Sequence, residues 1–369
     1  MKVLILKENL EKALSIVSKG LSLKPQLPIL SHLLLKAHHN QLELFSTNLE
    51  LGIIYTTPAK VEKEGEVAVP GKLLTEFVSS LFTDKIELEA TEKNLLVKTN
   101  KTRGNLSVGN PSDFPPFPEP SPVSKKLPLI KIKDAVLRTI FAASTDEGRP
   151  ILTGVRTVIS DSKLFLSSTD GYRLSKEEVD LGAKLQPLEV ILPAQSLLEM
   201  IRIAEIIKAE EVDFLIIENK NQVVFGLPHT KIFTRLIDGE FPNVEKIIPT
   251  GFKTKFMVNK DSFHQAVKTT SIFARGSANI IKIKIEKDGL KLLANTPQVG
   301  SEEDFIEART EGEEIEVAFN FRFLLDLLNN FPDKELVFES LGSLSPGVFK
   351  AKSEKYSFLH IIMPVRVQS

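Results

Sequence analysis

An internal repeat constrains this chain more than any other feature of its sequence. Four landmarks recur in the same order with a period of about 125 residues, which is longer than the period of solenoid repeats. Each copy is therefore expected to fold as a domain with its own core. At 369 residues the chain has room for two or three such domains. We divide it into three tandem copies, residues 1–120, 128–249 and 253–369.

The first two landmarks are an amphipathic helix and a β-hairpin. Apolar residues three and four positions apart predict the helices, which begin near Lys7, Lys133 and Asn259. The hairpins are predicted over residues 29–47, 151–169 and 280–296, and the first two end in the same Ser-Thr pair at the same spacing. In the third hairpin, Asp288-Gly289 is a strong signal for a two-residue turn.

The third landmark is a strand, a turn and a second helix, and the fourth is a bulky residue before proline. The strands begin at Val67, Val190 and Val317, and proline or asparagine gives each following helix a suitable entry. The closing motifs are Asp113-Phe114-Pro115, Glu240-Phe241-Pro242 and Ile362-Met363-Pro364. Each copy thus holds two helices and roughly eight short strands, an α+β plan. Three unrelated α+β domains with chance similarity are the alternative.

Two helices on one sheet face per copy suggest antiparallel sheets laid edge to edge, with the helices on one side. Such an array leaves two open sheet edges, and head-to-tail association of two copies would remove them. If the helices lined a ring, six helices about 10 Å wide would leave a hole of about 9 Å, too narrow for a DNA duplex. Twelve helices from two chains would leave about 28 Å, which admits one.

Composition excludes several classes of function. The 47 basic and 48 acidic residues balance, so a chain that grips nucleic acid over its whole surface is not expected. Cysteine is absent, which excludes thiolate metal sites and favours a reducing, cytoplasmic setting. The six histidines have no metal-ligand spacing, and no phosphate-binding loop or nucleophile motif occurs. We therefore expect no enzyme, no catalytic residue, no metal, no cofactor and no membrane contact.

Five segments together resemble the bacterial DNA polymerase III beta subunit, the sliding clamp, across nearly the whole chain. They are LPIL at 27–30, TDGYRL at 169–174, LIDGEFPNVEKIIP at 236–249, FNFRFLLDLLNNF at 319–331 and HIIMPVRV at 360–367. The resemblance implies three clamp domains per chain and a head-to-tail homodimer that encircles duplex DNA without sequence preference. It also implies that the ring tethers the polymerase and is opened by a loader.

The resemblance further implies a hydrophobic cleft between the second and third copies. It would bind Gln-Leu-x-Leu-Phe-type peptides from the polymerase III alpha subunit, the clamp loader delta subunit and other polymerases or repair proteins. One part would use Leu152, Thr169, Gly171, Tyr172, Arg173, Leu174, Pro242, Ile247, Ile361 and Met363, and the other Asn320, Phe323, Leu344, Pro364, Val365 and Arg366. Apolar walls suit leucine and phenylalanine, while Arg173, Arg366 and Asn320 could hold peptide carbonyls.

Several positions depart from the family's pattern. Tyr172 stands where histidine is common and Val365 where methionine is common, and three residues follow Arg366. For DNA the resemblance points to Lys24, Arg149 and Gln195, although Asp134 and Asp146 are acidic near basic or neutral family positions. For the ring joint it points to Lys72, Phe114, Ile272 and Phe273.

Simpler interpretations stay open for these residues. Met363 and Ile361 could be ordinary core residues, Phe114 could close its own domain, and Lys24 could be a solvated loop lysine. For the whole chain, a β-rich interaction scaffold that never touches DNA is the remaining alternative function.

Overall fold

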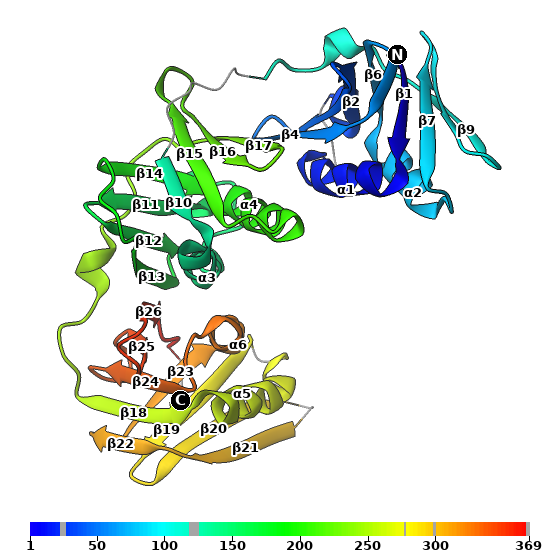
Figure 1. Ribbon diagram of the computed structural model, residues 1–369. Helices are drawn as coiled ribbons and strands as arrows, with labels where there is room; N and C mark the ends of the chain where they lie inside the picture. The colour runs from blue at the N-terminus through cyan, green and yellow to red at the C-terminus, as the bar shows by residue number, and fades with distance from the viewer. Residues whose placement is uncertain (23–26, 118–124, 277, 298–299, 367–369) are drawn as a thin grey trace. The chain divides into compact units, whose positions relative to one another are not determined.

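The computed structural model describes residues 1–22, 27–117, 125–276, 278–297 and 300–366 (Figure 1). The described residues form six α-helices and 26 β-strands, which are nine, eight and nine strands in the three copies. The chain divides into two compact units, residues 1–130 with 199–236, and residues 131–198 with 237–369. This division cuts through the central copy, so the boundaries 1–120, 128–249 and 253–369 stay a prediction.

The first unit contains two antiparallel sheets. The five-stranded sheet has the order β5-β1-β7-β8-β9, with β1 Lys2–Leu6, β5 Lys60–Lys63, β7 Lys85–Ala90, β8 Asn94–Lys98 and β9 Arg103–Ser107. The eight-stranded sheet has the order β10-β15-β16-β17-β4-β3-β2-β6, with β2 His32–His38, β3 Gln41–Thr47, β4 Leu51–Pro58, β6 Gly65–Pro70, β10 Lys125–Pro128, β15 Glu211–Ile217, β16 Gln222–Leu227 and β17 Thr230–Arg235. The helices α1 (Lys7–Val17) and α2 (Gly71–Ser80) pack against each other and against these strands (Figure 1).

The second unit repeats this plan. Its nine-stranded sheet has the order β14-β11-β12-β13-β26-β25-β24-β18-β22, with β11 Gly154–Ser160, β12 Lys163–Thr169, β13 Arg173–Asp180, β14 Leu188–Pro193, β18 Thr254–Asn259, β22 Arg309–Gly312, β24 Glu335–Ser340, β25 Gly347–Ala351 and β26 Ser357–Ile362. Its four-stranded sheet has the order β21-β20-β19-β23, with β19 Ile280–Glu286, β20 Gly289–Thr296, β21 Gly300–Glu307 and β23 Ile315–Asn320. The helices α5 (Lys260–Ala274) and α6 (Phe321–Asn330) pack together, and the remaining helices are α3 (Leu129–Ile140) and α4 (Ala194–Ile207).

Successive copies are joined by strand pairing, as the sequence predicted. β17 of the second copy pairs antiparallel with β4 of the first, from Thr230 opposite Tyr55 to Thr234 opposite Leu51. β26 of the third copy pairs in the same way with β13 of the second, from Arg173 opposite Ile362 onward. In both cases the closing strand of one copy meets the strand that follows the hairpin of the preceding copy, so the sheets do run edge to edge.

The predicted helix entries are largely confirmed. Asn259 precedes α5, and its side chain accepts hydrogen bonds from the backbone N–H groups of Asp261 and Ser262, each at 3.0 Å. Pro70 and Pro193 end the strands directly before α2 and α4. The prediction for the third helix was wrong at its start, because α3 begins at Leu129 and not near Lys133. The strand β10 ends at Pro128, so the apolar residues before Lys133 already belong to the helix.

Two further predictions need correction. The third hairpin turns at Lys287 and Asp288, because Gly289 already pairs with Glu286. Glycine is required at position 289 for another reason, since a Cβ there would lie 2.4 Å from the carbonyl oxygen of Ile306.

The three closing motifs are also not equivalent. Phe114 and Phe241 lie in linkers well after β9 and β17, whereas Met363 directly follows β26.

The third copy is built around a cluster of phenylalanines. Phe338 is fully buried, stacks on Phe256 at a ring-centroid distance of 4.6 Å and meets Phe349 edge-on at 5.1 Å. Phe319 packs on both Phe338 and Phe349. The aromatic rings of four strands therefore fill one continuous core between the sheets and the helices α5 and α6.

We predict that Phe338→Ala destabilises the third copy by about 3–5 kcal/mol, because the truncation leaves a cavity that rigid neighbours fill poorly. Urea unfolding followed by circular dichroism measures the effect. Phe82→Ala is the matched control, since Phe82 is fully exposed and its truncation should change the free energy of unfolding by less than about 0.5 kcal/mol. Equal effects of the two substitutions would contradict this account of the core.

Candidate functional site

The turn between β12 and β13 is held by its own side chains. The hydroxyl of Thr169 donates to the carbonyl of Arg173 at 2.6 Å and accepts from the backbone N–H of Gly171 at 3.0 Å. Asp170 accepts from the backbone N–H groups of Tyr172 and Arg173 at 2.8 and 3.0 Å, and Gly171 has a φ of +94°. The sequence-based interpretation of Asp170-Gly171 as turn chemistry is therefore confirmed.

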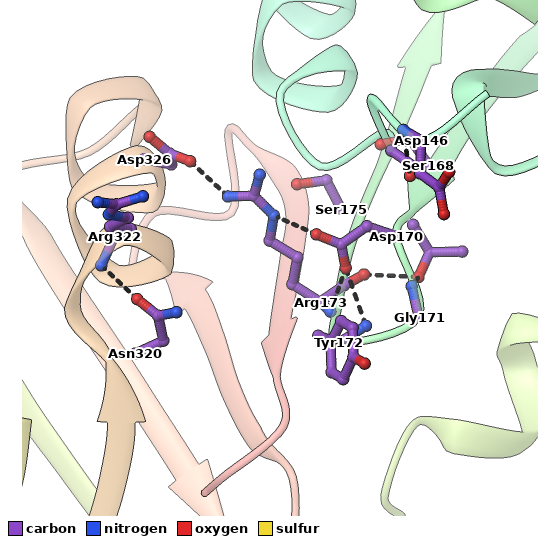
Figure 2. Close-up of polar contacts among 12 residues, drawn as sticks. Asp146, Ser168, Asp170, Gly171, Tyr172, Arg173, Ser175, Asn320, Arg322 and Asp326 are labelled. Atoms are coloured by element: carbon purple, nitrogen blue, oxygen red, sulfur yellow. Dashed lines mark hydrogen bonds and ion pairs between the residues drawn. The ribbon is translucent and has the colours of Figure 1, made fainter. Parts of the chain in front are cut away.

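Arg173 connects this turn to the helix α6 of the third copy (Figure 2). Its Nε donates to Asp170 Oδ2 at 3.0 Å and its Nη1 donates to Asp326 Oδ2 at 2.6 Å. The guanidinium also lies over the ring of Phe323, 4.6 Å from the centroid, and over Phe141 at 5.8 Å. With a side chain only 10% exposed, Arg173 fixes the turn against α6. These contacts favour that positioning role over direct capture of a peptide carbonyl.

The end of the third copy runs beside the same turn. The backbone N–H of Met363 donates to the carbonyl of Tyr172 at 2.8 Å, and that of Val365 donates to the carbonyl of Ala318 at 2.8 Å. Residues 363–366 are thereby held between the turn and the end of β23. Asn320 ends β23 and caps α6, since its side chain accepts from the backbone N–H of Arg322 at 2.9 Å (Figure 2).

The structure brings most of the predicted cleft residues together, some buried and some exposed. Leu174 and Ile361 are fully buried in a cluster with Phe241, Val244 and Val348, and for Ile361 this favours the alternative that it is an ordinary core residue. Tyr172, Leu344, Ile247 and Met363 are exposed by 61, 60, 43 and 39%, which is unusual for large apolar side chains. Leu152, Pro364 and Val365 are partly buried, and Pro242 and Arg366 are exposed. Exposed apolar side chains suit contact with a hydrophobic ligand.

The residues predicted to contact DNA are only partly described. Lys24 lies outside the described residues. Arg149 precedes the short helix Pro150–Thr153, and its Nε lies 3.3 Å from Asp146 Oδ2, so a carboxylate already neutralises part of its charge. Gln195 lies on the first turn of α4 and is exposed. Their role toward DNA stays a prediction.

The residues predicted for the ring joint differ in accessibility. Lys72 on α2 is well exposed, with Glu76 3.9 Å away, and Ile272 on α5 is 55% exposed. Phe273 is partly buried against the core of its own copy. Phe114 is only 8% exposed and packs with Leu34 and Phe45. For Phe114 this burial favours the alternative that it closes its own copy.

Sequence reasoning missed His360, the most deeply buried titratable group near the site. Its Nδ1 lies 2.7 Å from the hydroxyl of Ser175, across the β13–β26 pair, while its Nε2 has no hydrogen-bond partner among the described residues. Its ring lies between Phe141, at 5.2 Å, and Phe358, at 6.4 Å. Burial, and secondarily the nearby charge of Arg173, hold the pKa of His360 well below its ordinary value of 6.5. The only signal in the sequence was its place in a predicted strand, where every second side chain faces the core. That alternation could have predicted its burial.

Three sequence models of the DNA polymerase III beta subunit match the chain, for the N-terminal domain over residues 1–118, the central domain over 126–243 and the C-terminal domain over 245–366. A beta sliding clamp from Staphylococcus epidermidis is 28% identical over 360 residues, covering 94% of both chains, and one from Staphylococcus aureus has the same identity and coverage. The DNA polymerase sliding clamp from Bacillus subtilis superposes over the full length of both chains with a TM-score of 0.91 at 26% identity. The DNA polymerase III subunit beta from Pseudomonas aeruginosa does so with a TM-score of 0.90, also at 26% identity.

Three α+β copies joined by strand pairing place this chain in the clamp class of folds. More narrowly, the chain belongs to the DNA polymerase III beta subunit family over all three of that family's domains. No helix within the described residues is long and apolar enough to span a membrane.

We predict that folding stability falls as the pH drops below about 6.5, because of His360. Its folded pKa is lowered, so the unfolded chain takes up the proton first. The contribution to stability is fully present above the unfolded pKa and decreases below it, with a slope approaching about 1.4 kcal/mol per pH unit. Urea unfolding at pH 7.5, 6.5 and 5.5 measures this slope, and His360→Phe should remove it. The exposed His229 serves as the matched control, since His229→Ala should leave the slope unchanged. If both variants keep the slope of the parent protein, another group is responsible.

Proposed function

We propose that this chain is a DNA sliding clamp, a homodimeric ring that encircles duplex DNA and tethers the replicative polymerase. The observation that carries the proposal is the repeated joint. β4 pairs with β17 and β13 pairs with β26, and the equivalent strands left over are β21 in the third copy and β9 in the first. These two strands lie at the edges of their sheets, so pairing β21 of one chain with β9 of a second would close the array in both directions.

The charges on the two edges support head-to-tail pairing. β21 carries four carboxylates, from Glu302, Glu303, Asp304 and Glu307. β9 begins with Arg103, and Lys101 lies two positions before it. Opposite charges favour β21 against β9, whereas two copies of β21 would repel each other. A head-to-tail dimer is therefore preferred over a symmetric pairing of like edges.

One position at or just beyond the end of the first helix of each copy gives an independent argument. It lies twelve residues after the start of each helix and is occupied by Lys19 in the 3-10 turn after α1, by Phe141 directly after α3 and by Ile272 within α5. Lys19 pairs with Glu199 of the next copy at 3.4 Å, and Phe141 packs against His360 of the next copy at 5.2 Å. Ile272 has no following copy within the chain and is 55% exposed. We infer that Ile272 contacts the first copy of a second chain.

A closed ring needs little direct contact with DNA. A topological link holds the duplex without strong phosphate contacts, and few, sequence-blind contacts leave the ring free to slide. This suits a chain with a net charge of −1 and with Lys24, Arg149 and Gln195 as its candidate DNA contacts.

The ring acts as a processivity factor and not as an enzyme, and the absence of cysteine agrees with a cytoplasmic setting. A β-rich scaffold that never meets DNA is not favoured, because it would not need matching open edges.

The second part of the proposal is a cleft for linear peptides of the Gln-Leu-x-Leu-Phe type. The polymerase III alpha subunit, the clamp loader delta subunit and other polymerases or repair proteins would present them. The exposed Tyr172, Leu344, Ile247 and Met363 supply the apolar contacts for leucine and phenylalanine. Arg173 positions the turn, and the exposed Arg366 is the better candidate for a peptide carbonyl. So small a contact is expected to exchange readily between partners.

Ile272→Asp is expected to convert the dimer into a monomer, because it buries a carboxylate beside an acidic edge. Gel filtration with light scattering measures the mass. The control is Ile130→Asp, which changes another exposed isoleucine and should leave the dimer intact. If the parent chain is already a monomer, the ring is refuted. If the parent chain is a dimer and Ile272→Asp is also a dimer, Ile272 lies outside the joint.

Deletion of residues 363–369 is expected to weaken binding of a Gln-Leu-x-Leu-Phe peptide at least about tenfold, or ~1.4 kcal/mol, because the chain end forms one wall of the cleft. Fluorescence anisotropy measures the affinity. Deletion of residues 367–369 alone is the matched control and should retain binding. Both variants should unfold at the temperature of the parent protein, and undiminished binding after the longer deletion would refute this cleft.

A further inference from the structure

Two histidines at the tip of the β2–β3 hairpin, His38 and His39, are not used by the proposed function. His38 is the last residue of β2, and His39 and Asn40 form the turn before Gln41. The Nδ1 atoms of the two imidazoles lie 3.1 Å apart, and the ring planes are nearly perpendicular at 87°. Both side chains are accessible, His38 with 37% of its surface exposed.

The distance between the two nitrogens fits a chelate. A zinc ion binds imidazole nitrogen at about 2.0–2.1 Å, so two nitrogens 3.1 Å apart would subtend an angle of about 98° at the metal. This lies between the square-planar and tetrahedral values, which copper, nickel and zinc ions prefer. The two nitrogens share a hydrogen bond at this distance, and a metal ion bound by both would replace the proton between them.

The surroundings fix which nitrogen of His38 faces His39. Its Nε2 lies 3.0 Å from Glu43 Oε2, so in the neutral imidazole Nε2 donates to the carboxylate and Nδ1 accepts the hydrogen bond from Nδ1 of His39. A carboxylate behind a histidine in this way orients the ring and raises its basicity in metal sites. Glu43 lies on the neighbouring strand, so the sheet register fixes this support.

The backbone also holds the second ring in place. His39 has a φ of +47°, a left-handed conformation that is uncommon for residues other than glycine. Its backbone N–H donates to Glu64 Oε1 at 3.2 Å. Asn40 has a φ of +57° as well, and two positive φ values are what a type I′ turn of a two-residue hairpin requires, so this turn fixes the backbone of His39 directly after His38.

We propose that His38 and His39 form a two-nitrogen site for a divalent transition-metal ion of the zinc, nickel or copper class. Among the described residues no group of three or more histidine, aspartate or glutamate side chains is placed to hold a metal ion. The remaining coordination positions are open to water. An imidazole pair selects these borderline metals over magnesium and calcium, which prefer oxygen ligands.

Isothermal titration of the untagged dimer with Zn²⁺ and Ni²⁺, and with Mg²⁺ as the contrasting ion, tests the site. One Zn²⁺ or Ni²⁺ per chain should bind, and Mg²⁺ should not. His38→Gln and His39→Asn should each weaken binding at least tenfold. Asparagine is chosen at position 39 because it tolerates a positive φ, so the turn is retained. Glu43→Gln should weaken binding by about 10–100-fold through loss of the support behind His38.

The matched control is His229→Asn, which removes an exposed histidine that also has a positive φ, +58°, from another turn. This variant should bind the metal as the parent protein does. Absence of binding by the parent protein, or unchanged affinity in His38→Gln and His39→Asn, overturns the proposal. Circular dichroism of each variant verifies that the fold is intact.

Discussion

Main-chain hydrogen bonding between the closing strand of one copy and the post-hairpin strand of the preceding copy determines the rest of this structure. An unpaired strand edge exposes a row of backbone donors and acceptors that must find partners. The β4–β17 and β13–β26 pairs satisfy two such edges with the same geometry. Because each joint adds backbone pairing to side-chain packing, successive copies are fixed in register and not merely tethered by their linkers.

The candidate peptide site is a consequence of the second joint. β26 ends at Ile362, directly opposite Arg173, so the residues that follow must leave the sheet beside the β12–β13 turn. The Met363–Tyr172 backbone bond then holds the chain end there. Turn and chain end belong to different copies, and Arg173 bonded to Asp326 ties the turn to a helix of the other copy. The site therefore exists only because two copies are joined.

The sequence predicted what is local and what repeats. The Thr169-Asp170-Gly171 turn, the caps of α5 and α6, and the edge-to-edge arrangement follow from residue chemistry within a few positions or from the repeat itself. Contacts between distant residues were not accessible in this way. Nothing near Arg173 indicates Asp326, 153 positions away, and nothing near His360 indicates Ser175. The incorrect prediction that Gly289 lies in the hairpin turn has a similar cause. The close approach of the Ile306 carbonyl in β21 requires glycine there, and the turn itself does not.

In a chain of three copies, a residue that contacts the following copy has equivalents in each copy. The equivalent residue in the third copy has no following copy to contact. Lys19 meets a carboxylate and Phe141 meets a buried aromatic environment, each supplied by the following copy. Ile272 occupies the same position with an apolar side chain and is left exposed, although burying an isoleucine is worth about 1.5–3 kcal/mol. The same asymmetry holds for the strands, because β21 and β9 stand where the other two joints have pairs. Two unrelated features of the third copy, the exposed Ile272 and the edge strand β21, thus point to the same partner, and the proposed second copy of the chain would supply it.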